Sequence, residues 1–148
     1  MVCQSVKDAH HTFETLAGLE FQLEEKEDRE VELTSIRLNT DHTVTVGETD
    51  GPSMIKCAGT WSILETASEE DRPFRMTLDR SYEGGHRRKP TDVGEFEYHV
   101  VREFYGNVGT VGDSFAVQGI IHGHDDISNV NVEVGYFSLI DATSDLRP

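Results

Sequence analysis

The sequence predicts an all-β domain in which an antiparallel meander of about eight strands closes into a barrel, preceded by one N-terminal helix. Hydrophobic and polar side chains alternate with a period of two over most of residues 19–141, as in strands with one buried face. Short polar turns separate the alternating runs, and no spacing after residue 18 fits a β-α-β unit. Closure into a barrel removes the exposed edges of such a meander; a two-sheet sandwich is the alternative.

Residues 5–17 are predicted to form the helix. Ser5 can cap its first turn, and Gly18 provides the stop. Between them, apolar residues recur at spacings of three and four on one face: Val6, Ala9, Phe13, Leu16 and Ala17. After Gly18 the helical period gives way to strict alternation, which marks the start of the strands.

The first half of the meander contains four alternating runs, at residues 19–24, 34–38, 44–46 and 55–61. Turn-forming residues stand at 39–42 and at 50–52. The acidic stretch 24–32 separates the first two runs. We expect this stretch to be a solvated turn flanked by strand ends.

The second half contains four more runs, at residues 74–82, 95–105, 115–121 and 130–140. A polar, basic loop separates the first two of these runs, and Gly106, Gly109 and Gly112 are expected in the next turn. Residues 122–129 are expected to connect the last two strands. Residues 137–140 are apolar on both faces, so we expect this end to be covered on both sides.

A length of 148 residues suits one domain, so we expect a single β-barrel domain over residues 1–148. With 13 basic and 28 acidic residues, the formal net charge is -15. This charge repels phosphate backbones and anionic lipids, so neither nucleic acid nor a membrane surface is an expected partner. No apolar run approaches the roughly 20 residues of a membrane-spanning helix, so the chain is expected to be soluble and not membrane-embedded.

The N-terminus and the cysteine content leave the compartment open. Residues 1–8 show no basic segment followed by an apolar stretch, so no secretory signal is expected in the chain as given. An intracellular location, or an organellar one after removal of a presequence, agrees with this pattern. Cys3 and Cys57 are too few for a disulfide framework, and their redox state stays open. Cys57 shares a predicted face with Trp61, where we expect a buried and inert thiol.

The helix, the meander and the tripeptide Gly59-Thr60-Trp61 together resemble the calycins, which include the lipocalins and the fatty-acid-binding proteins. Lipocalins carry a Gly-x-Trp near the start of the barrel, whereas about three predicted strands precede it in this chain. The resemblance implies a lipocalin-like barrel in which the indole of Trp61 closes one end and borders the ligand site.

A second similarity concerns Arg80-Ser81-Tyr82, since fatty-acid-binding barrels use an interior Arg-x-Tyr to hold a ligand carboxylate. This resemblance implies that Arg80 and Tyr82 are ligand-binding residues. An inward arginine needs a partner, because an unpaired buried charge is costly. The alternative is that residues 80–82 end a strand, with the guanidinium group reaching solvent or a neighbouring glutamate.

Arg102 repeats the surroundings of Arg80, since each precedes an aromatic residue and a glycine. If the two strands form a hairpin about Arg88, Arg80 lies opposite Phe96. Arg102 then lies six residues further along, or about 20 Å at 3.3–3.4 Å per residue. We therefore expect that one small ligand cannot contact both arginines.

His122 and His124 form the most metal-like stretch, because a continued strand directs both imidazoles to one face. A zinc site needs three or four ligands, and the spacing specifies no third one. We therefore predict no metal site and keep these two residues as weak candidates. No cofactor motif or catalytic constellation is present either, so neither an enzyme nor a cofactor is expected.

Basic residues gather in residues 72–89, which hold six of the thirteen, including Arg87, Arg88 and Lys89. Such a cluster is either an ordinary solvated loop or a surface that docks a partner protein. The leading prediction is a non-enzymatic binding or assembly module, an accessory subunit that docks on a larger protein complex. The alternative is a carrier of a small apolar or carboxylate ligand in the barrel interior.

Overall fold

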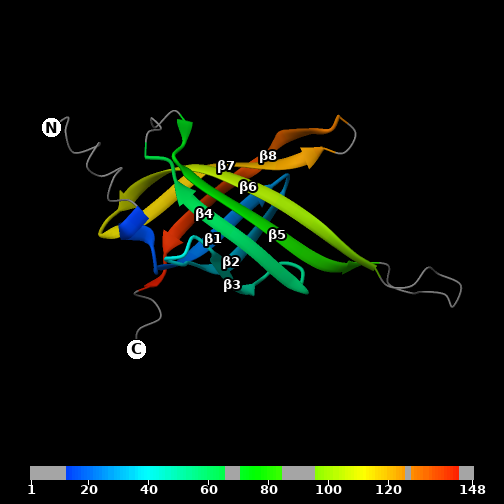
Figure 1. The fold of residues 1–148 in the computed structure, drawn as a ribbon, viewed down its shortest axis with the longest axis horizontal. Helices are drawn as coiled ribbons and strands as arrows, with labels where there is room; N and C mark the ends of the chain where they lie inside the picture. The colour runs from blue at the N-terminus through cyan, green and yellow to red at the C-terminus, as the bar shows by residue number, and fades with distance from the viewer. Residues whose placement is uncertain (1–12, 66–70, 85–95, 126–127, 144–148) are drawn as a thin grey trace, which may run out of the picture.

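The computed structural model describes residues 13–65, 71–84, 96–125 and 128–143. Most of them lie in eight strands: β1 (Glu20–Glu27), β2 (Glu30–Leu38), β3 (Val44–Thr49), β4 (Lys56–Ile63), β5 (Phe74–Gly84), β6 (Phe96–Val111), β7 (Ser114–Asp125) and β8 (Val130–Asp141). The strands are antiparallel, and the sheet curls into a nearly closed barrel with one short helical turn before it (Figure 1). The predicted fold class is confirmed.

The strands follow one another as a simple meander, in the order β3-β2-β1-β8-β7-β6-β5-β4. Pairing of β1 with β8 joins the first strand to the last. In the part of the chain that the structure describes, β3 and β4 meet through one bridge, between Thr43 and Thr60, and through a hydrogen bond of 2.8 Å from Trp61 N to His42 O. The seam between β3 and β4 is therefore closed at one end and carries no ladder along the rest of its length.

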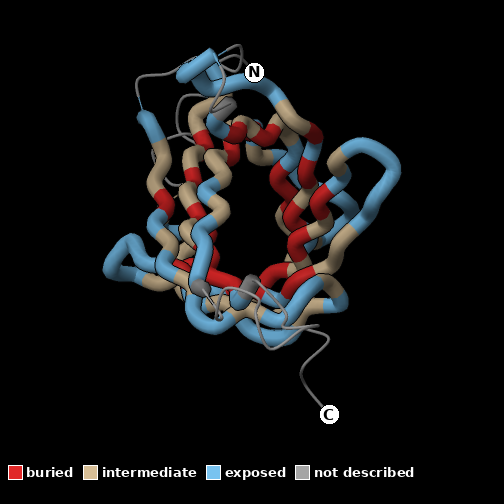
Figure 2. The backbone as a smooth tube through the Cα atoms, turned by 90° about the vertical axis from the view of Figure 1, so that its right-hand side faces the viewer, coloured by how far each residue is buried: buried red, intermediate tan, exposed pale blue. Residues whose placement is uncertain are grey.

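Aromatic side chains fill the half of the barrel interior nearest the helical turn. Phe74 lies between Trp61 and Phe137, with ring centroids 6.4 and 6.2 Å away. Phe104 meets Phe137 edge-on at 5.2 Å. Buried positions recur around the ring of strands, on the side that faces the interior (Figure 2). This half is a close-packed hydrophobic core, which supplies most of the stabilisation by burial.

The helical turn at residues 13–16 covers one end of the barrel. Phe13 stacks on the ring of Trp61 with centroids 4.8 Å apart, and Trp61 Nε1 donates to the carbonyl of Asn39 at 2.8 Å. Trp61 is thus buried at this end of the barrel, beneath the turn. Of the predicted helix 5–17, residues 5–12 lie outside the described residues. No helix in the described part combines the length and apolar character needed to cross a membrane.

The acidic stretch 24–32 differs from the prediction of a solvated turn. β1 continues to Glu27 and β2 begins at Glu30, so only two residues turn between them. Asp28 takes a positive φ of 54° there, a conformation that aspartate tolerates better than most residues. The stretch forms strand because alternate glutamates face the interior and find basic partners there.

Two further expectations about turns are wrong. Gly106 and Gly109 lie within β6, and the turn to β7 uses Gly112, whose φ is +61°. A Cβ atom at Gly106 would lie 2.8–2.9 Å from Val117 and Phe137, so this glycine lets strands pack closely. The connection predicted at 122–129 is also shorter, because β7 continues through His124 to Asp125.

Residues 137–140 are covered on one side only. Phe137 and Leu139 point inward and are buried, whereas Ile140 on the outer face is 40% exposed. β8 lies between β1 and β7, so it is not an edge of the sheet. Among the described residues, no other element covers the apolar outer face of β8.

Candidate functional site

A polar cavity occupies the end of the barrel opposite the helical turn. It has a volume of about 580 Å³, and we call it the polar chamber. Its walls come mainly from β1, β2, β5 and β6 and are mostly charged or aromatic: Glu25, Glu27, Glu30, Val31, Glu32, Asp50, Gly51, Pro52, Arg80, Tyr82, Tyr98, Val100 and Arg102. Inward positions of the same strands are apolar nearer the turn, so the interior changes from apolar to polar along the barrel axis.

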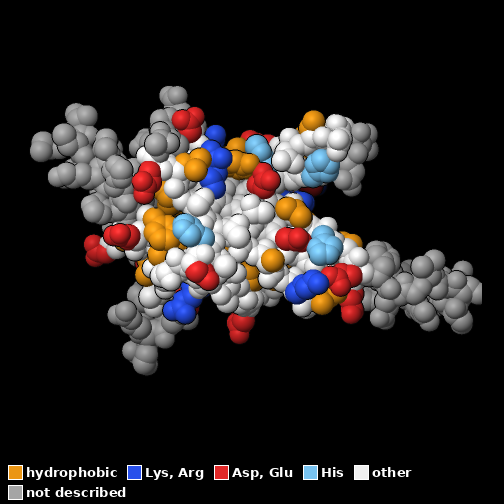
Figure 3. Space-filling model, in the orientation of Figure 1, with side chains coloured by type: hydrophobic (Ala, Val, Ile, Leu, Met, Phe, Trp, Pro, Cys, Tyr) orange, Lys and Arg blue, Asp and Glu red, His pale blue; other side chains and the backbone are white. Residues whose placement is uncertain are grey.

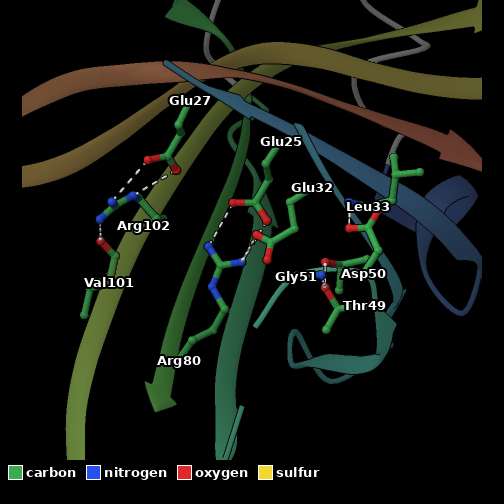
Figure 4. Close-up of polar contacts among 11 residues, drawn as sticks. Glu25, Glu27, Glu32, Leu33, Thr49, Asp50, Gly51, Arg80, Val101 and Arg102 are labelled. Atoms are coloured by element: carbon green, nitrogen blue, oxygen red, sulfur yellow. Dashed lines mark hydrogen bonds and ion pairs between the residues drawn. The ribbon is translucent and has the colours of Figure 1, made fainter. Parts of the chain in front are cut away.

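A buried ion pair between Glu25 and Arg80 lies at the inner wall of the chamber (Figure 4). Arg80 donates from both terminal nitrogens, at 2.7 and 2.9 Å, to the two carboxylate oxygens of Glu25. The two side chains are 4% and 3% exposed. Burial lowers the pKa of Arg80, but the hydrogen bonds and charge of Glu25 outweigh it and raise that pKa. Arg80 therefore stays charged.

A second ion pair, between Glu27 and Arg102, lies beside the first (Figure 4). Arg102 donates from Nε at 3.1 Å and from one terminal nitrogen at 3.2 Å. These side chains are 30% and 23% exposed, so water screens them more than the first pair. Glu25 and Glu27 are alternate residues of β1, so the two ion pairs link this strand to β5 and to β6.

Glu32 is a carboxylate of the chamber that is only partly compensated. Its nearest recorded cation is Arg80, at 3.9 Å, and Arg80 is already engaged by Glu25. Burial, followed by repulsion from Glu25, raises the pKa of Glu32, while Arg80 acts in the opposite direction. Gly51 leaves room for this side chain, because a Cβ atom there would overlap the Glu32 carboxylate.

Arg80 also carries a buried donor that is not satisfied. Its Nε has no hydrogen-bond partner among the described residues, although the side chain is only 4% exposed. An unsatisfied buried donor is costly, by about 1–3 kcal/mol. Arg80 Nε is itself enclosed by the protein, so this unsatisfied donor adds to the cost of holding Arg80 in the interior.

The register of β5 and β6 overturns the predicted separation of the two arginines. Arg80 pairs with Val100 rather than Phe96, and Arg102 pairs with Leu78. The hairpin is thus centred near residue 90, not at Arg88. Because paired residues share a face, Arg80 and Arg102 lie two positions apart on one wall, and both line the chamber.

Of the three predicted ligand-binding residues, the structure brings two to the chamber. Arg80 and Tyr82 line it, and Tyr82 stacks on Tyr98 with ring centroids 5.6 Å apart. Burial raises the pKa of the Tyr82 hydroxyl. Trp61 lies in the aromatic half instead and is not part of the chamber wall. The partner that an inward Arg80 requires is Glu25, from the chain itself.

The other candidates from the sequence do not form a site in the described part of the chain. His122 packs against the ring of Tyr105 at 4.8 Å, and His124 lies 3.4 Å from the side-chain oxygen of Asn131. The described residues contain no group of three or more metal-ligating side chains. The predicted partner-binding residues lie outside the described residues: Arg87, Arg88 and Lys89.

Ser81, His99 and Asp79 form a cluster on the outer face that the sequence reasoning missed. His99 Nδ1 lies 2.8 Å from Asp79 and 3.2 Å from Ser81 Oγ. A hydrolytic triad needs the acid and the nucleophile on opposite ring nitrogens, whereas here both contact the same one. Cys57 is half-buried, and burial raises the pKa of its thiol, so it is a poor nucleophile.

Glu25, Glu27 and Glu32 line the chamber but are not among the site residues that the sequence predicts, because the expectation for the acidic stretch 24–32 is a solvated turn. The signal that identifies the first two is the period of two, which continues from Leu23 through Glu25 to Glu27. An inward arginine on another strand requires such an inward acid.

Comparison with protein-family models, with curated proteins and with solved structures finds no match for this chain. The candidate site therefore rests on the geometry of the chamber: two ion pairs and a partly compensated carboxylate around one cavity.

Breaking the buried pair on one side should destabilise the fold. Arg80→Met leaves the Glu25 charge buried without a partner, and we expect a loss of about 3–5 kcal/mol in the free energy of unfolding. The double variant Arg80→Met with Glu25→Leu removes both charges and should recover most of that loss. Urea denaturation measures both effects. A double variant as unstable as the single one would contradict this account of the pair.

Glu32 should make stability depend on pH. Because its pKa is raised by folding, its contribution to stability is fully present below the unfolded pKa of about 4.3 and is lost as pH rises through the folded pKa. Glu32→Gln does not suffer this loss, so it should be more stable than the unmodified chain at neutral pH. The difference should shrink towards about pH 4. Denaturation curves between about pH 4 and neutral pH test the sign of this difference in stability. Asp113→Asn, on a distant turn, is the control.

Proposed function

We propose that this protein is a non-enzymatic binding module that carries a small ligand in the polar chamber. The observation that supports this proposal best is the placement of two ion pairs beside a cavity of about 580 Å³ inside the barrel. Pockets of several hundred cubic ångströms with a few convergent polar groups are typical of small-molecule sites. The proposal narrows the carrier function expected from the sequence to one end of the barrel.

The cost of the buried charges supports a binding role. Replacing a buried ion pair by packed apolar residues is often neutral or stabilising, because desolvation offsets the attraction between the charges. A barrel that needed only stability could extend its aromatic core through this end. Charged groups that break the apolar pattern of an interior are frequent at functional sites.

The packing of the aromatic half supports a polar ligand over an apolar one. Phe74, Phe104 and Leu139 are completely buried in that half, where their side chains occupy the lumen. The chamber wall is instead dominated by carboxylate, guanidinium and phenol groups. The meander order of the strands agrees with the proposed likeness to the up-and-down barrels of the calycins. Barrels of that group bind ligands in the lumen, so this likeness also supports a carrier function.

Blocking the chamber should abolish carriage of the ligand. Val100 lines the chamber and pairs with Arg80, so Val100→Trp places an indole inside it. Val101 is the next residue and is 41% exposed, so Val101→Trp adds the same bulk outside. We expect native mass spectrometry of gently purified protein to find a bound small molecule with the unmodified chain and with Val101→Trp, but not with Val100→Trp. Retention of the ligand by Val100→Trp would place it elsewhere.

Protein docking is the second candidate function, and the outer face of β8 favours it. Tyr136 is 61% exposed and Ile140 is 40% exposed, both on that face. A second cavity, of about 700 Å³, includes Tyr136 and Ile120 in its walls. The face drawn in Figure 3 differs, because acidic, basic and hydrophobic side chains are mixed on it. The basic cluster at residues 87–89 remains a predicted docking element.

A docked partner should be lost when this outer face becomes charged. Tyr136→Glu leaves the barrel interior untouched, since the side chain points outward, and we expect it to release a protein that co-purifies with the unmodified chain. Charge reversal at Arg87, Arg88 and Lys89 tests the predicted basic cluster in the same way. Size-exclusion chromatography from the native source gives the readout. Elution of the unmodified chain as a partner-free monomer would exclude the docking function.

A further inference from the structure

The connection between β3 and β4 forms part of the wall of the polar chamber. Residues 50–55, which we call the strap, join the two strands at the end of the seam that carries no ladder in the described chain. Asp50, Gly51 and Pro52 line the chamber, and Pro52 and Ser53 are also exposed. The strap therefore lies between the chamber and the solvent.

Hydrogen bonds hold the strap at its two ends. At the first end, Asp50 N donates to the carbonyl of Leu33 at 3.0 Å, and Leu33 N donates to the Asp50 carboxylate at 2.7 Å (Figure 4). At the second end, Ile55 N donates to the carbonyl of Ser81 at 2.7 Å. No hydrogen bond to another described residue is recorded for the three residues before Ile55: Pro52, Ser53 and Met54. Loss of the two hydrogen bonds with Leu33 therefore suffices to free the first end.

The side chain of Glu32 lies directly beneath the strap (Figure 4). An added Cβ atom at Gly51 would overlap the Glu32 carboxylate, so the strap and this carboxylate are packed against each other. Glu32 precedes Leu33 in β2, which places the covered carboxylate next to the residue that holds the strap. With the strap in this position, the Glu32 side chain is only 25% exposed.

The surroundings of Glu32 disfavour its negative charge. Acids outnumber bases among the charged side chains that line the chamber with it: Glu25 and Glu27 from β1, Glu30 from β2, Asp50 from the strap, Arg80 from β5 and Arg102 from β6. Two phenols, Tyr82 and Tyr98, complete this set. Both arginines bind other carboxylates, at 2.7 and 2.9 Å for Arg80 and at 3.1 and 3.2 Å for Arg102.

Burial is the largest cause of the raised pKa of Glu32, and repulsion from Glu25 and from Asp50 acts in the same direction. Arg80, 3.9 Å away, opposes them. An ionised Glu32 therefore gains free energy when water reaches it. Displacement of the strap gives water that access, and it also moves Asp50 away.

From this arrangement we propose that the strap is a pH-sensitive cover of the chamber, which closes over a protonated Glu32 and is released from Leu33 when Glu32 ionises. The closed state binds the proton more tightly than the open state, in which water solvates the carboxylate. Closure is therefore fully favoured below the ordinary pKa of glutamate, about 4.3, and this advantage is lost as pH rises through the raised pKa. The inference goes beyond the proposed function, because the strap can open and close whether or not the chamber holds a ligand.

Amide hydrogen exchange, followed by NMR, measures the opening of the strap. Protection factors remove the intrinsic pH dependence of exchange, and we compare them at Asp50 and Leu33 from about pH 5 to pH 8. We expect lower protection at these two amides than in the middle of β7, because the strap opens without unfolding of the barrel. Their protection should fall several-fold as the pH rises. Glu32→Gln should abolish this fall, and Asp113→Asn, which makes the same change of charge on a distant turn, should retain it.

A steric variant tests the contact between the strap and Glu32 without a change of charge. Gly51→Ala places a methyl group where the carboxylate lies, so it should lower the protection of Asp50 and Leu33 at every pH. The double variant Gly51→Ala with Glu32→Ala removes the overlap and should restore that protection. Gly109→Ala is the matched control, because an added Cβ atom there meets nothing within 4 Å.

Three results would overturn the inference. Equal protection of the strap amides and the β7 amides would show that the strap opens only when the whole barrel unfolds. An undiminished pH effect in Glu32→Gln would show that another group controls the strap, and equal protection in Gly51→Ala and Gly109→Ala would show that Glu32 does not pack against it. None of these results bears on the carrier function, which the loss of a native ligand in Val100→Trp tests separately.

Discussion

The ion pair between Glu25 and Arg80 is the interaction on which the polar half of the barrel depends. Glu25 belongs to β1 and Arg80 to β5, which are not neighbours in the sheet, so the pair spans the lumen. Glu27 and Arg102 make a parallel link between β1 and β6. Both links lie in the half of the barrel where the seam between β3 and β4 carries no ladder in the described chain. Charge pairs thus connect opposite walls where backbone hydrogen bonds do not complete the cylinder.

The two halves of the interior are stabilised in different ways. Near the helical turn, aromatic rings such as Phe74 and Phe104 are completely buried, and the stabilisation from this burial involves no titrating group. At the other end, desolvation offsets much of the attraction between the paired charges. Apolar burial therefore stabilises one end of the barrel, and charge pairs across the lumen hold the other.

Much of the fold could be predicted from the sequence, because a period of two along strands such as β5 is a direct consequence of one buried face. The charged chamber could not be assigned, since glutamates at inward positions have the same composition as a solvated turn. The register of β5 against β6 was harder still to predict. Moving the centre of the β5–β6 hairpin from residue 88 to residue 90 changes the partner of Arg80 by four residues, or about 13 Å. Nothing in a polar loop specifies its midpoint, so the proximity of the two arginines emerges only in three dimensions.

The partial seam has a consequence for solubility. In the described residues, the Thr43–Thr60 bridge and the hydrogen bond from Trp61 N to His42 O join β3 to β4 at one end, which leaves the rest of the two strand edges side by side without a ladder. Such edges can recruit the backbone of another molecule. β3 has only six residues, β2 is irregular between Thr34 and Ile36, and Lys56 places a charge at the start of β4. These features discourage the addition of a strand from another molecule at this seam.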